Sequence, residues 1–205
     1  MKTAAAFILV FTAIAPLCQA GPIATFTAGT YSTSCCAQTL GWEFSVNSGV
    51  TVDRLFWYDP NHTLGKDFPV MMWKSDSSSV IPQTNVGSVS GTYDAATGYW
   101  RVAVSPVNLT AGSTYLIAGF VTKADPTEWN IQDLTTSPAI TFIEAVDDGS
   151  PSGLAFPGQH ETCCGVAFIG ANFGVVDTGV PEPGTWATLA AGLATLGAML
   201  RRRRA

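Results

Sequence analysis

The chain has 205 residues, of which 47% are hydrophobic and 12% are charged, and this charged share is about half of that in an average soluble domain. Five of the ten basic residues, Lys2 and the arginines at positions 201–204, lie at the two ends, so residues 21–183 hold five basic and all fifteen acidic residues, a net charge of −10. Such a surface repels phosphate backbones, which excludes nucleic acid as a partner.

The N-terminal residues 1–20 have the pattern of a signal peptide. Lys2 is followed by a neutral, mostly apolar run to Leu17, and Cys18-Gln19-Ala20 places small residues where a signal peptidase reads the chain. The alternative is an N-terminal membrane anchor, but the run is short for a span of about 20 residues. We therefore predict that this segment engages the secretion translocon and is removed by signal peptidase.

Residues 21–177 are expected to form one all-β domain, an antiparallel β-sandwich of the Ig-like or jelly-roll type. Apolar and polar residues alternate over short windows, which is typical of strands with one buried face. Turn residues separate these windows, as in Asn47-Ser48-Gly49 and Thr110-Ala111-Gly112. Seven or eight short strands and no helix are expected. The predicted strands are Leu40–Val46, Val50–Tyr58, Phe68–Trp73, Tyr99–Val104, Thr114–Val121, Ala139–Glu144 and Gly165–Val176.

Four stretches of this region resemble an uncharacterised β-sandwich domain of secreted bacterial proteins. They are Gly49–Asp59, Val70–Trp73, Trp100–Ile117 and Ala167–Phe173, and the resemblance extends over about residues 25–177. It implies the same fold class, and it implies no catalytic residue, because that family has none established.

Four cysteines remain after removal of the signal peptide, as the adjacent pairs Cys35, Cys36 and Cys163, Cys164. An even number in an exported protein favours disulfides, and three pairings are possible. Linking neighbouring residues is strained, so we expect at least one bridge across the domain, which would stabilise it by about 3–5 kcal/mol. The alternative is a Cys/His metal or redox site with His160. Adjacent cysteines converge poorly on one ion, so we predict no metal and no cofactor.

The sequence offers little for catalysis. Only His62 and His160 could serve as a base for a nucleophile, and neither belongs to a recognisable motif, so we predict that the chain is not an enzyme, with a secreted hydrolase as a weaker alternative. Trp57 and Tyr58 lie on opposite faces of one strand, so most aromatic residues should be core residues. Trp129 is the candidate for stacking on a sugar ring, which makes a carbohydrate-binding module the main alternative function.

The C-terminal end contains three elements in a fixed order. Pro181, Glu182 and Pro183 come first, an apolar run of about 16 residues to Leu200 follows, and Arg201, Arg202, Arg203 and Arg204 end it. As a helix this run reaches about 24 Å, a marginal membrane span. By the positive-inside rule the arginines stay in the cytoplasm and the domain faces outward.

This order resembles the PEP-CTERM sorting tail, which an exosortase recognises and processes in bacteria that make exopolysaccharide or biofilm. The resemblance implies that Pro181, Glu182 and Pro183 are the recognition motif and that the arginines are the basic stop, with a plain membrane anchor as the alternative. We expect residues 178–183 to form a linker with the motif, 184–200 a transmembrane helix and 201–205 a cytoplasmic tail. The chain is then an exported envelope or matrix protein, transiently anchored in the inner membrane. Its expected role is as a non-catalytic structural component of the surface or biofilm exopolysaccharide, which is also a candidate partner.

Overall fold

The computed structural model describes residues 21–34, 36–123, 125–149, 152–160, 170–176 and 192. Residues Ala20–Val176 form one compact unit, separate from the two ends of the chain. The predicted signal peptide and, residue 192 apart, the predicted transmembrane helix and basic tail lie outside the described residues. Within the described ranges, no helix is long and apolar enough to cross a membrane.

The described part of the domain is all-β and antiparallel, as predicted. Its strands are β1 (Ala24–Thr25), β2 (Ala28–Thr33), β3 (Gln38–Val46), β4 (Val50–Tyr58), β5 (Asp67–Lys74), β6 (Ser79–Gly87), β7 (Thr92–Asp94), β8 (Tyr99–Leu109), β9 (Thr114–Val121), β10 (Pro126–Gln132), β11 (Thr135–Thr136), β12 (Ile140–Asp148), β13 (Gln159–His160) and β14 (Ala171–Val175).

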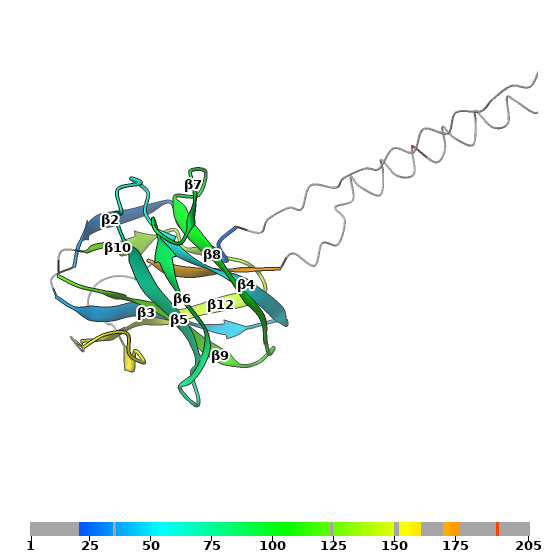
Figure 1. The fold of residues 1–205 in the computed structure, drawn as a ribbon. Helices are drawn as coiled ribbons and strands as arrows, with labels where there is room; N and C mark the ends of the chain where they lie inside the picture. Colours follow the sequence, from blue (N-terminus) through cyan, green and yellow to red (C-terminus); the bar gives the residue numbers. More distant parts are fainter. Residues whose placement is uncertain are drawn as a thin grey trace, which may run out of the picture. The chain divides into compact units, whose positions relative to one another are not determined.

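Two sheets form the sandwich (Figure 1). The larger has the order β13-β12-β3-β9-β5-β6 and the smaller has the order β14-β4-β8-β7, while β1-β11 and β10-β2 form separate two-stranded pairs. Turn chemistry sets several of the connections. Gly112, between β8 and β9, has a φ of +79°, a left-handed conformation that glycine adopts without steric cost.

The core lies between the facing surfaces of the two sheets, where aromatic rings from both sheets meet. The ring of Phe44 on β3 lies 5.0 Å from that of Phe173 on β14, and the ring of Trp57 on β4 stacks on Phe68 of β5 at 4.3 Å with an interplanar angle of 6°. All four side chains are at most 1% exposed. Each large apolar side chain buried in this way contributes about 1.5–3 kcal/mol.

The outer face of the smaller sheet is also covered. The side-chain amide of Asn172 on β14 donates a hydrogen bond of 2.7 Å to the carbonyl of Ala24, and Phe26 packs edge-on against Tyr58 with ring centroids 4.9 Å apart. The N-terminal segment of the domain, around Ala24 and Phe26, therefore lies over this face. This explains why Phe56 and Tyr99 are buried although they point away from the main core.

The outer face of the larger sheet carries a second, smaller apolar cluster. Its buried members are Met71, Trp73, Leu116, Ala118 and Val146. Leu154 and Phe156, from the segment that follows β12, pack against it. This segment leads directly to β13, which adds to the edge of the sheet through two residue pairs with β12.

Candidate functional site

Most of the predicted site residues lie outside the described part of the chain. These include the motif Pro181, Glu182 and Pro183, the arginine stop and the cysteines at positions 35, 163 and 164. Cys36 is exposed, and its Sγ lies 3.5 Å from Oε1 of Gln38. No disulfide is present among the described residues, which hold one cysteine of the predicted four, so the cross-domain bridges stay a prediction.

The tryptophans of the two sheets are core residues. Trp42, Trp57, Trp73 and Trp100 are at most 8% exposed, which confirms that most aromatic residues serve packing. Trp129 lies on β10, where its backbone is opposite Thr30 of β2. Its side chain is outside the described structure, so its role in binding sugar stays a prediction.

A fully buried carboxylate lies in the loop after β4. Asp59 accepts hydrogen bonds from Nε1 of Trp100 at 2.9 Å and from the backbone amides of two loop residues at 3.1 Å each. These three donors fix the loop. His62, in the same loop, is exposed and stacks on the ring of Tyr93 at 4.1 Å. Both groups are thus engaged in contacts that hold the loop in place.

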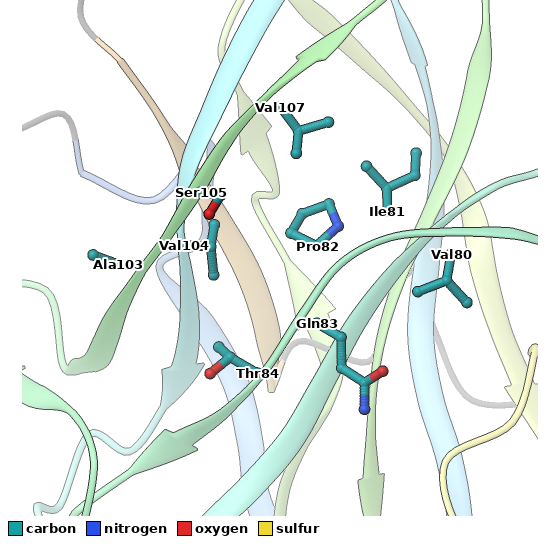
Figure 2. A pocket seen from close by; sticks show the side chains of 9 residues that line it. All are labelled: Val80, Ile81, Pro82, Gln83, Thr84, Ala103, Val104, Ser105 and Val107. Carbon is teal, nitrogen blue, oxygen red and sulfur yellow. The ribbon is translucent and has the colours of Figure 1, made fainter.

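An open groove of about 520 Å³ runs between β6, an edge strand of the larger sheet, and the part of β8 that β7 does not pair with (Figure 2). Figure 2 shows Ile81, Pro82, Val104 and Val107 between the two strands. Thr84 and Ser105 add hydroxyl groups and Gln83 adds an amide, and none of the lining residues is ionisable. The groove can therefore offer apolar contact and hydrogen bonds, but its lining does not combine a nucleophile with a general base.

A cluster of three ionisable groups lies on the outer face of the larger sheet. The register of β3 and β12 places Glu43 directly opposite Glu144, next to a β-bulge in β12. Glu144 Oε1 lies 2.6 Å from Nδ1 of His160 on β13, and the hydroxyl of Ser75 donates a hydrogen bond of 2.6 Å to Glu43 Oε1. One ligand atom from each of the two glutamates and the histidine lies within 4.8 Å of the others.

Sequence reasoning missed this cluster. It considered His160 together with the nearby cysteines, whereas the structure brings the histidine to two glutamates on separate strands. One signal was available, since Glu43 is the only charged residue in the apolar stretch Leu40–Val46. The partner of that glutamate could not be read without the strand order.

The fold of the domain and the C-terminal motif together define the class of protein. The described domain is an antiparallel β-sandwich. The C-terminal end matches the family described as PEP-CTERM protein-sorting motif over residues 179–204, which confirms the resemblance seen in the sequence. The chain is therefore an exported protein sorted through this motif, which an exosortase processes and which anchors such proteins in the membrane before cleavage. The comparison with curated proteins finds no significant match.

Proposed function

We propose that the domain is a non-catalytic structural component of the cell surface or of a biofilm exopolysaccharide. The observation that carries this proposal is the sorting motif at residues 179–204, joined to a sandwich domain. Exosortase sorting delivers the domain to the outside of the cell, and a closely packed sandwich is suited to persist there as a passive part of the matrix.

The contacts of the buried ionisable groups support a structural role. Asp125, at 8% exposure, forms an ion pair with Lys66 at 2.5 Å and accepts two hydrogen bonds from Thr122 at 2.7 Å. Burial raises the pKa of Asp125, but the hydrogen bonds from Lys66 and Thr122 outweigh burial and hold its pKa below the usual value. A carboxylate kept charged by fixed donors stabilises the conformation of its loop and is poorly suited to accept a proton.

The first experiment tests the processing step. Intact mass of the protein from an exosortase-bearing host should show a mature C-terminus close to Pro183, whereas an exosortase deletion strain should retain Ala205. Glu182→Ala should also leave the tail uncut. Retention of Ala205 in the exosortase-bearing host would mean that the tail is a plain anchor.

The second experiment tests the role in the matrix. Deletion of the gene should lower the cohesion of the exopolysaccharide matrix, and the wild-type chain should restore cohesion while Glu182→Ala does not. The matched control is Asp94→Asn, which removes one half-buried charge from the domain and should restore cohesion fully. A deletion strain with an unchanged matrix would refute the structural role. So would turnover of a glycan or ester substrate that a single substitution such as Asp59→Asn abolishes.

The alternative is a carbohydrate-binding module that uses Trp129. In affinity electrophoresis through the exopolysaccharide of the producing cells, a binder migrates more slowly than in a gel without polysaccharide. Retardation that Trp129→Ala removes would favour this alternative, and equal mobility of both proteins in both gels would exclude it.

A further inference from the structure

Glu43, Glu144 and His160 converge on the outer face of the larger sheet from three different strands. The two glutamates are a directly opposed pair, so their Cβ atoms are separated by only about 4.5–5.5 Å. Like charges at this separation destabilise a sheet. The repulsion is poorly screened, because Glu43 is half-buried and the side chain of Glu144 is 35% exposed.

The surrounding groups hold this arrangement in place. Ser75 orients Glu43 through its hydrogen bond, and Lys74, the residue before it, pairs with Asp76 at 2.9 Å. The bulge of β12 between Phe142 and Glu144 sets which residues of that strand face outward. Bulges of this kind frequently redirect a side chain toward a site.

The three side chains match the ligand preferences of a divalent transition metal. Zn²⁺ binds imidazole nitrogen and carboxylate oxygen at about 2.0–2.2 Å, so two ligand atoms of a tetrahedral ion lie about 3.3–3.5 Å apart. The ligand atoms of Glu43, Glu144 and His160 already lie within 4.8 Å of one another. Small rotations of the three side chains would therefore bring these ligand atoms into contact with one ion. The backbones that carry the side chains are fixed by strand pairing.

We propose that Glu43, Glu144 and His160 form a binding site for a divalent transition-metal ion, with Zn²⁺ as the preferred occupant. The ion neutralises the opposed glutamates, and Ser75 keeps Glu43 oriented toward it, as hydrogen-bonded partners of metal ligands commonly do. The ion also ties β13, which pairs with β12 through only two residue pairs, to the centre of the sheet. This assignment goes beyond the proposed function and does not depend on it.

The test is isothermal titration of the full-length chain with Zn²⁺ at neutral pH, after chelation and alkylation of its thiols. We expect one ion per chain. His160→Gln, Glu144→Gln and Glu43→Gln should each weaken binding by at least about 10- to 100-fold, the loss usually seen when even an indirect partner of a metal is removed. The control Asp94→Asn removes one carboxylate charge on the other sheet and should bind as the wild type does.

Substitution with Co²⁺ separates this site from a thiolate site. Bound Co²⁺ should give visible d–d absorption without a thiolate-to-cobalt charge-transfer band, and Glu144→Gln should remove the absorption. The side chain of His160 is 63% exposed, so His160→Gln should have the same thermal stability as the metal-free wild type. Loss of metal binding by this variant therefore does not result from unfolding. The proposal is overturned if the alkylated wild type binds no Zn²⁺, or if the three variants bind as tightly as Asp94→Asn.

Discussion

The contact between Gly119 on β9 and the buried ring of Trp57 predicts a large effect of one added methyl group. A Cβ at position 119 would lie 2.2 Å from Cζ3 of Trp57, whereas carbon atoms in contact are separated by about 3.5–4.0 Å. One of the two groups would have to move by more than about 1 Å. Trp57 has little room, because it is 1% exposed and stacked on Phe68.

Gly119→Ala should therefore cost about 3 kcal/mol, at the upper end of the usual penalty for overpacking. For a domain of about 150 residues this corresponds to a fall in Tm of about 6–12 °C. The free energy of unfolding would be measured by urea denaturation followed by tryptophan fluorescence, and Tm by calorimetry. Gly65→Ala is the matched control. Nothing lies within 4 Å of the added Cβ there, so stability should change by less than about 1 kcal/mol.

A double-mutant cycle tests whether the indole ring is the cause. Trp57→Phe removes the ring atom that the new Cβ would meet, so Gly119→Ala in that background should cost about 1 kcal/mol or less and the coupling energy should be about 2 kcal/mol. If Gly119→Ala has the stability of the wild type, the packing argument is wrong. If its cost is the same in both backgrounds, the strain arises from the backbone and Trp57 is not its source.

Three other outcomes can be checked. Asp59→Ala should lower the free energy of unfolding, measured in urea, by about 3 kcal/mol or more, because it leaves the indole N–H of Trp100 and two backbone amides without their acceptor. Asp59→Asn should cost less, because its side chain keeps one acceptor oxygen. The pKa of Asp125 is lower in the folded than in the unfolded protein, where it is about 4, so its ionisation stabilises the fold above about pH 4. This stabilisation is lost as the pH falls through the folded pKa. The stability difference between wild type and Asp125→Asn should therefore shrink below about pH 4. Intact mass after alkylation of the native exported protein should show fewer than four modified cysteines, and four would refute the cross-domain disulfide.

Strand positions were predictable where a run of β-branched and aromatic residues follows a turn signal. Val50–Tyr58 and Thr114–Val121 coincide with β4 and β9, and these two runs follow Asn47-Ser48-Gly49 and Thr110-Ala111-Gly112. The predicted strand Gly165–Val176 contains β14, and residues 165–169 lie outside the description. Strand β6 (Ser79–Gly87) was missed because it is an edge strand, largely exposed or half-buried and interrupted by Pro82, so it carries no clear alternation.

The layers outside the sandwich could not be predicted from periodicity. Tyr99 and Trp100 are neighbours on one strand and both are buried, since the N-terminal segment covers the face that alternation assigns to solvent. The same limit applies to the cluster of Glu43, Glu144 and His160. Its members meet through the pairing of β3 with β12, and strand order is a property of the whole chain that short sequence windows do not contain.

The position of β14 has a consequence for how an exported chain folds. This strand, the last among the described residues, pairs with β4 (Figure 1). The hydrogen bond from Asn172 to Ala24 joins residues 148 positions apart. Contacts of such long range make folding slow, because the entropy cost of closing a long loop is incurred before the stabilising contacts form. The sandwich cannot be completed until residue 175 is outside the cell together with the rest of the domain. Strand β14 therefore reaches β4 only when the sorting motif, which begins at residue 179, is close behind it.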